Sequence, residues 1–195
     1  MTAMDMTKSA TAGPYRLEVT ARPSGGTLAV VYRFFNDGAR NVYLFNRLYT
    51  GIGNDGLYQT RRDLLNVEID RTHIILSKRI FGVPPDLDVE RPNVPCVTLV
   101  RPKSHFEETI HLALPLKPVN PYHLPDDAHL AGPPLTPPLW FELGYFVAPP
   151  ESDALARSVR TAEGPALRFD PFPVSSQAIL RAGPFELAVP ARPEK

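Results

Sequence analysis

Proline is the feature of this sequence that most restricts its fold. The chain of 195 residues contains 23 prolines and 12 glycines, whereas proline makes up about 5% of an average protein. Because proline lacks a backbone donor, it is excluded from helix interiors and from central strands. Hydrophobic residues nevertheless make up 43% of the chain. The combination predicts a packed core built from short strands that are separated by proline-rich loops.

Apolar and polar residues alternate along residues 15–22, with the period of a half-buried strand. Similar alternating or continuously apolar runs predict further strands. The expected strands cover 15–22, 27–36, 41–49, 64–70, 73–80, 96–100, 106–114, 139–147 and 185–189. Turn residues separate these segments, so the order predicts an all-β fold: an antiparallel, immunoglobulin-like sandwich with long proline-rich loops.

At most one short helix is expected, over residues 151–164. Ser152 is a possible N-cap there, and Leu155 and Val159 have the spacing of one helix face. We expect a single sandwich domain over residues 13–195 and a disordered tail over residues 1–12.

Residues 28–45 show a hydrophobic-x-hydrophobic-x-Asn pattern, then a short loop, then V-x-L-F. In this pattern the stretch resembles bacterial intracellular proteinase inhibitors of the BsuPI type. The resemblance implies an immunoglobulin-like fold class. No family-specific functional residue matches, so the resemblance assigns no activity and no site residue.

The net charge and the apolar segments of the sequence indicate the compartment and the classes of partner to expect. Lys and Arg together number 21, as do Asp and Glu, so no overall field favours nucleic acid or anionic lipid. The first residues lack the apolar segment of a signal peptide, and no run approaches about 18 apolar residues. Cys96 is the only cysteine. We expect a cytoplasmic protein without a nucleic-acid or membrane partner.

Gly51, Gly53 and Gly56 spell G-x-G-x-x-G within residues 49–58. A dinucleotide site requires a helix that opens at such glycines. The residues that follow show no sustained helical period, while Asn54-Asp55-Gly56 has turn chemistry. The stretch therefore predicts a turn rather than a phosphate-binding loop.

Strands 27–36 and 41–49 are expected to pair as a hairpin, with Asn36 opposite Val42. In that register one face of the hairpin is apolar, and the other gathers aromatic residues and arginines, which are enriched in protein interfaces. The predicted binding residues are Arg33, Phe35, Tyr43, Phe45, Arg47 and Tyr49. Either a protein partner or a second copy of the chain occupies this face, or residues 150–185 cover it. Residues 115–138, which contain PxxP spacings, are the second candidate surface.

Metal and catalytic motifs give weaker patterns. His123, Asp126, Asp127 and His129 cluster in a proline-rich run whose spacing matches no common zinc site. A serine elbow G-x-S-x-G is absent from the sequence. We therefore predict no catalytic residue, no bound metal and no cofactor.

These patterns favour a non-enzymatic protein-interaction or binding module. Two alternatives remain open: an enzyme that depends on a metal or on Cys96, and a structural subunit of a larger assembly.

Overall fold

The computed structural model describes residues 5–89, 92–122, 133–170, 172 and 174–193. Strands dominate, and the only helices in this part of the chain are short 3-10 turns. The elements are β1 (Met6–Ala12), β2 (Tyr15–Ser24), β3 (Thr27–Asn36), β4 (Val42–Arg47), β5 (Tyr49–Ile52), β6 (Tyr58–Thr60), β7 (Asn66–Ile69), β8 (Ile74–Lys78), β9 (Cys96–Val100), β10 (Ser104–Ala113), β11 (Leu139–Val147), η2 (Pro150–Leu155), β12 (Arg157–Thr161), β13 (Gly164–Arg168), η3 (Val174–Ser176) and β14 (Ala178–Phe185).

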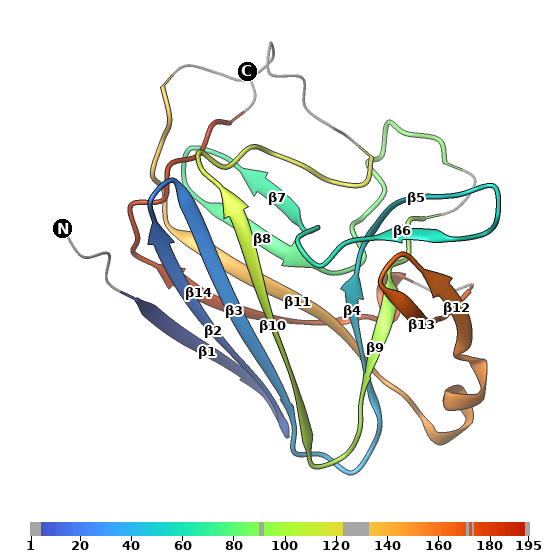
Figure 1. The fold of residues 1–195 in the computed structure, drawn as a ribbon. Coiled ribbons are helices and arrows are strands. Elements are labelled where there is room, and N and C mark those ends of the chain that lie inside the picture. The colour runs from blue at the N-terminus through green and yellow to red at the C-terminus, as the bar shows by residue number, and fades with distance from the viewer. Residues whose placement is uncertain (1–4, 90–91, 123–132, 171, 173, 194–195) are drawn as a thin grey trace.

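Two sheets form the molecule. The first is antiparallel, with the strand order β1-β2-β3-β10. The second is larger, with the order β5-β6-β12-β13-β9-β4-β11-β8-β7, and β14 pairs with β11. Most pairs in it are antiparallel, but β8 lies parallel to β11. In Figure 1 the first sheet lies on the left, while β5, β6, β12 and β13 extend to the right.

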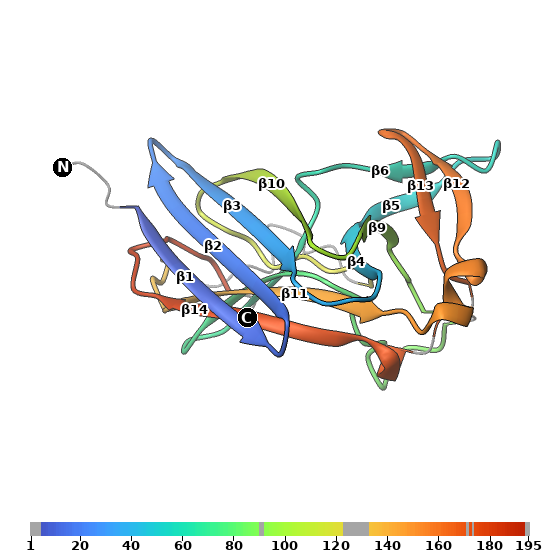
Figure 2. The same cartoon turned by 90° about the horizontal axis from the view of Figure 1, so that it is seen from below.

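The main core lies between the two sheets. In the left part of Figure 2 the strands β1, β2, β3 and β10 form one layer, and β11 and β14 lie below them in the other. On β3 every second residue, from Leu28 to Phe34, points into this core and is buried, while the alternate residues are more exposed. A second, smaller core covers the opposite face of β4. There Tyr43 and Phe45 pack with Phe169 and Phe172. The all-β sandwich that the sequence predicts is therefore confirmed.

The predicted hairpin of strands 27–36 and 41–49 is wrong. β3 pairs with β2 and β10, whereas β4 pairs with β9 and β11 in the other sheet. Asn36 fixes this crossover because its buried amide donates to the carbonyls of Arg40 (2.8 Å) and Val100 (3.0 Å). The burial pattern explains the difference, since β4 is buried on both faces, as expected for a central strand.

Two other expectations about local structure are wrong. Residues 151–164 form the 3-10 helix η2 and then the β12–β13 hairpin, not one helix. The expected disordered tail contains β1, because seven residues from Met6 to Ala12 pair in unbroken register with β2. Gly13, with a φ of +58°, allows the tight turn between these two strands.

The stretch 49–58 forms a hairpin between β5 and β6, so the predicted turn is confirmed. The amide of Gly53 donates to the carbonyl of Leu57 at 2.9 Å, and that of Gly56 donates to Gly53. In the described part of the chain, no helix has the length and apolarity needed to cross a membrane.

Candidate functional site

A pocket of about 120 Å³ lies where β4 passes into β5. Five separate parts of the chain line it: residues 48–50, residues 64–66, Arg79, the pair Asn93 and Pro95, and residues 119–121. Because Asn66, Asn93 and Asn120 all contribute to its lining, we call it the asparagine pocket. Its size is close to that of a cavity of about 150 Å³ that holds benzene, so it suits one compact chemical group.

Hydrogen bonds hold the walls of the pocket together. Val67 and Val119 exchange two backbone hydrogen bonds, of 2.7 and 2.9 Å, which fix residues 119–121 beside the edge of β7. The backbone N–H of Asn93 donates to the Tyr122 hydroxyl at 2.8 Å. The backbone N–H of Tyr122 in turn donates to Oδ1 of Asn120 at 2.9 Å. The pocket is thus built from loops that are tied to the sheet.

Arg79 is the only charged residue among the described residues that line the pocket. Its guanidinium group lies 3.1 Å from Glu68 and 2.9 Å from Glu142, and Glu142 also lies 3.7 Å from Arg181. Two carboxylates and two guanidinium groups therefore balance each other, and the pocket carries little net charge.

Asn66 lines the pocket and is 2% exposed. Its side-chain nitrogen is buried without a hydrogen-bond partner in the described part of the chain. Asn66 pairs in register with Ser77 on β8, whose hydroxyl is also buried and unpartnered. Such groups are exceptions in folded proteins, and they lower stability unless a partner is supplied.

The lysine cluster lies beside the pocket, inside the sandwich; we use this name for Tyr32, Asn46, Lys78 and Glu108. Lys78 is fully buried, and its ammonium group donates to three oxygen atoms. These are Oε2 of Glu108 at 2.6 Å, the carbonyl of Arg62 at 2.7 Å and the carbonyl of Asn46 at 3.3 Å. All three N–H groups of the ammonium are therefore used.

The Tyr32 hydroxyl completes this cluster. It donates to Glu108 at 2.7 Å and accepts from the Asn46 side chain at 3.1 Å. Burial lowers the pKa of Lys78, while the nearby carboxylate of Glu108 opposes that shift. Burial also raises the pKa of Tyr32 well above its usual range, and Glu108 adds to the effect.

The lysine cluster positions the walls of the asparagine pocket. The three segments that Lys78 joins continue directly into the lining: Asn46 is followed by residues 48–50, Arg62 by residues 64–66, and Lys78 by Arg79. Because each N–H of the ammonium already donates to a protein oxygen, none is left to bind a ligand. We interpret its role as structural.

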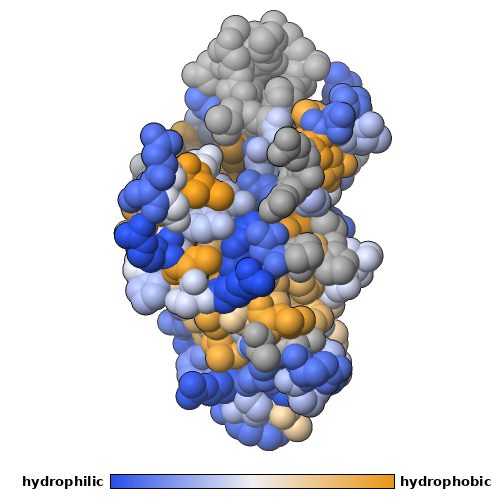
Figure 3. All heavy atoms as spheres, turned by 90° about the vertical axis from the view of Figure 1, so that its right-hand side faces the viewer, coloured by the Kyte–Doolittle hydropathy of each residue, from blue (hydrophilic) through white to orange (hydrophobic). Residues whose placement is uncertain are grey.

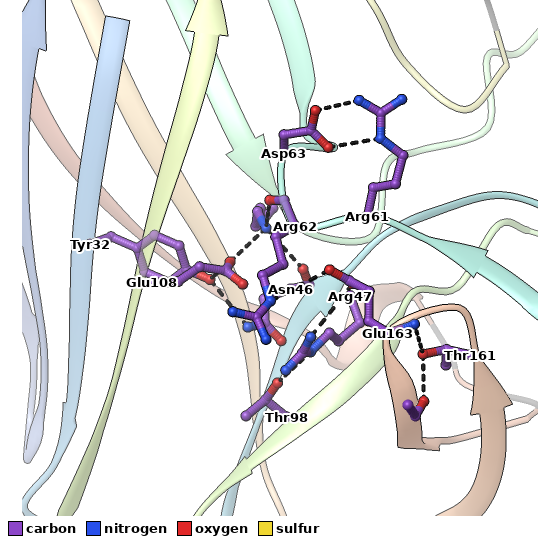
Figure 4. Close-up of polar contacts among 12 residues, drawn as sticks. Tyr32, Asn46, Arg47, Arg61, Arg62, Asp63, Thr98, Glu108, Thr161 and Glu163 are labelled. Carbon is purple, nitrogen blue, oxygen red and sulfur yellow. Dashed lines mark hydrogen bonds and ion pairs between the residues drawn. The ribbon is translucent and has the colours of Figure 1, made fainter.

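A looser group of charged residues leads from this cluster to the surface. Glu163, on the turn of the β12–β13 hairpin, lies 3.6 Å from Arg47 and 3.5 Å from Arg62. Arg47 also donates to the Thr98 hydroxyl at 3.3 Å. In Figure 4 the side chains run from Tyr32 and Glu108 on the left to Glu163 on the right, with Thr98 below Arg47.

The structure does not bring the six predicted binding residues onto one surface. Arg33 and Phe35 lie on the outer face of the first sheet. There Arg33 pairs with Glu107, and the Phe35 ring lies 3.8 Å from the Arg16 guanidinium carbon. This face is exposed, but it is separate from β4.

Tyr43 and Phe45 are buried beneath the segment that follows β13. The Phe169 ring contacts Tyr43 and the Phe172 ring contacts Phe45, each with 4.9 Å between ring centroids. Of the two interpretations that the sequence left open for these residues, coverage by residues 150–185 therefore describes the structure.

Arg47 joins the charged group around Glu163, and Tyr49 is the one predicted residue among those lining the asparagine pocket. Tyr49 packs edge-on against Tyr58 with 5.1 Å between ring centroids. The Arg168 guanidinium carbon lies 5.6 Å from the ring centroid of Tyr49 and 5.1 Å from that of Tyr58. The other lining residues carry no motif in the sequence. Their only shared sequence feature is that three of them, Asn66, Asn93 and Asn120, are asparagines.

Neither Cys96 nor the candidate metal ligands are among the described residues that line the asparagine pocket. His123, Asp126, Asp127 and His129 fall outside the described residues. Within the described ranges, no three His, Cys, Asp or Glu side chains lie together as a metal site requires. Cys96 is fully buried, and burial raises the pKa of its thiol, while Arg168 opposes the shift.

The face formed by β5, β6, β12, β13 and η2 carries apolar residues in small separate groups among hydrophilic ones (Figure 3). The described residues on this face form no single broad apolar patch. In comparisons with known proteins, no family model, curated protein or solved structure matches the chain.

Proposed function

We propose that this chain is a non-enzymatic binding module, and that the asparagine pocket anchors one compact group of a protein partner. The observation that carries the proposal is the pocket itself. Its lining combines apolar residues with three asparagines, and hydrogen bonds tie its walls to the sheet. Such concave sites with a few fixed polar groups are typical of ligand binding.

The chemistry of the lining favours binding over catalysis. Acid–base and nucleophilic catalysis need groups whose pKa lies near the working pH. The described lining residues include no Asp, Glu, His, Cys or Lys. Nearby, the ammonium of Lys78 is fully hydrogen-bonded and the thiol of Cys96 is buried.

The size of the pocket favours a protein partner over a free small molecule. The efficiency of drug-sized ligands is about 0.3 kcal/mol per non-hydrogen atom, with a ceiling near 1.5 kcal/mol for the best very small ones. A group of benzene size therefore usually binds weakly by itself. An anchor side chain gains further contacts around the pocket, as hot-spot residues do in protein interfaces.

NMR of the full chain with a set of fragments of benzene size tests this proposal. We expect the side-chain amide signals of Asn66, Asn93 and Asn120 to shift when a fragment binds. Asn93→Phe should fill the pocket and abolish the shifts of the Asn66 and Asn120 amides. The wall should keep its position in this variant, because the backbone N–H of residue 93 still donates to the Tyr122 hydroxyl.

Asn54→Phe, in the β5–β6 turn and outside the lining, is the matched control and should keep the shifts. If no fragment perturbs these amides in the unchanged chain, or if binding persists in Asn93→Phe, the proposal fails.

A further inference from the structure

We infer that Lys78 and Asn46 react inside the folded chain to form a covalent amide cross-link, with Glu108 as the acid–base group and ammonia as the released product. The reaction occurs once in each chain, and the inference does not depend on the proposed binding function. Two features of the lysine cluster support it: a buried amine held against a carboxylate, and a side-chain amide of Asn46 whose oxygen has no partner.

The four side chains of the lysine cluster form a closed ring of contacts. Lys78 donates to Oε2 of Glu108 at 2.6 Å, and the Tyr32 hydroxyl donates to the same oxygen at 2.7 Å. The side-chain nitrogen of Asn46 donates to that hydroxyl at 3.1 Å, and the Lys78 nitrogen lies 3.3 Å from the backbone carbonyl of Asn46. Figure 4 shows Tyr32, Glu108 and Asn46 gathered at this point. The amine therefore contacts both the proton acceptor and the residue that it attacks.

The side-chain oxygen of Asn46 is buried and has no hydrogen-bond partner in the described part of the chain. Leaving a buried carbonyl oxygen unpaired is costly, and such atoms are rare in folded proteins. The nitrogen of the same amide contacts Tyr32, which is hydrogen-bonded to Glu108. A protonated Glu108 at this position stabilises the negative charge that develops on the oxygen when its carbon is attacked.

The reaction begins with a proton transfer from the Lys78 ammonium to the carboxylate of Glu108. Burial lowers the pKa of Lys78 and so favours the neutral amine, although the charge of Glu108 opposes the shift. The lone pair of the amine then attacks the side-chain carbonyl carbon of Asn46, a reaction that a fixed, desolvated geometry accelerates. A bond from Nζ to this carbon forms, and the bond from the carbon to Nδ2 breaks. The leaving nitrogen takes up both protons that the lysine loses, one of them through Glu108, so it departs as ammonium and the carboxylate is restored.

The cross-link joins two strands that are not hydrogen-bonded to each other among the described pairings. Asn46 on β4 and Lys78 on β8 are 32 residues apart, and both strands pair with β11. A covalent bond between them closes a loop in the unfolded chain and lowers its entropy, as a disulfide does. Because Cys96 is the only cysteine, a disulfide within the chain cannot supply this restraint.

Mass spectrometry of the purified full chain tests the inference. We expect an intact mass that is lower than the mass of the unreacted sequence by one molecule of ammonia. Trypsin cleaves after lysine and arginine, so the unreacted chain yields 41–47 and 72–78 as separate peptides. An acylated lysine is not cleaved, so the cross-linked chain should instead yield one branched peptide that joins 41–47 to 72–79.

Two neighbouring glutamates provide the test of the acid–base group and its matched control. Glu108→Gln removes the group that carries the proton but still offers an oxygen to the Tyr32 hydroxyl, and it should abolish the branched peptide. Glu107→Gln, on the exposed face of the same strand, should leave the yield of the branched peptide unchanged. Circular dichroism verifies that both variants are folded. Loss of Lys78 lowers stability whether the chain holds the ion pair or the cross-link, so the mass and not the stability decides between them.

The unchanged chain gives the decisive result even if Glu108→Gln does not fold. The full sequence mass, together with separate peptides 41–47 and 72–78 from the folded chain, would overturn the inference. A branched peptide that persists in a folded Glu108→Gln variant would overturn the role given to Glu108.

Discussion

Replacing Lys78 by methionine should cause a large loss of stability. The substitution keeps much of the side-chain volume but removes three hydrogen bonds, to Glu108 at 2.6 Å, to the Arg62 carbonyl at 2.7 Å and to the Asn46 carbonyl at 3.3 Å. It also leaves the carboxylate of Glu108, which is 7% exposed, without its cation. Removing one partner of a buried ion pair typically costs about 3–5 kcal/mol.

Urea denaturation measures this loss. For a chain of this size an m-value of about 3 kcal/mol per molar is reasonable, so the midpoint should fall by roughly 1–1.7 M urea. Arg71→Met, at an exposed position between β7 and β8, is the matched control. It should change the free energy of unfolding by no more than about 0.5 kcal/mol, as surface substitutions usually do.

The double variant Lys78→Met with Glu108→Gln separates the lost charge pair from lost packing. Glutamine is neutral and still offers an oxygen to the Tyr32 hydroxyl, which donates to Glu108 at 2.7 Å. The double variant should therefore be more stable than the sum of the single effects by at least about 1 kcal/mol. A loss of less than about 1 kcal/mol in the free energy of unfolding for Lys78→Met, or strictly additive effects of the two substitutions, would refute the conclusion that the buried Lys78–Glu108 ion pair stabilises the fold.

Two further predictions concern Tyr43 on the covered face of β4 and the close packing of Gly144 against Arg79. Burial, with the carboxylate of Asp153 adding to it, raises the pKa of Tyr43 to about 12, so the folded chain holds this proton more tightly than the unfolded chain, whose tyrosines titrate near pH 10. The contribution of this proton to folding stability is therefore complete below pH 10 and is lost as the pH rises through 12; it amounts to about 2–3 kcal/mol at most. Tyr43→Phe should flatten the fall in the urea midpoint between these pH values. An unchanged dependence of the midpoint on pH would contradict the reasoning. Gly144→Ala would place a Cβ atom 2.7 Å from the Arg79 Cβ and should lower the free energy of unfolding by about 1–3 kcal/mol. Gly51→Ala, whose added Cβ would have no atom within 4 Å, should be neutral in the same urea-denaturation series. Equal effects at both glycines would show that crowding by Arg79 and Gln177 around the added Cβ is not the cause.

Local patterns identified most of the strands but few of their partners. The segments 27–36, 96–100 and 139–147 coincide with β3, β9 and β11, because alternation and β-branched residues act within a single strand. The β12–β13 hairpin was missed because Leu155 and Val159 imitate a helical spacing. Its signal was the two-residue turn before Gly164, whose φ is +103°. β1 was missed because its residues are too polar to predict burial.

The candidate site was largely hidden from the sequence. Tyr49 was identified, although for a hairpin face that does not form. The pocket gathers residues from Leu48 to Pro121, on five segments that no short spacing connects. Asn66 reads as an ordinary strand residue until its position on β7 and its burial are known.

The sequence by itself determined the class of fold. Its prolines exclude long helices, and its period-two apolar pattern requires strands with one or two buried faces. The tertiary structure alone decided which strands share a sheet. The short loop after Asn36 permits either a hairpin or a crossover, and the choice depends on the distant carbonyl of Val100 and on aromatic rings beyond residue 168. Pairing energies of this kind come from residues far apart in the chain, so no local pattern records them.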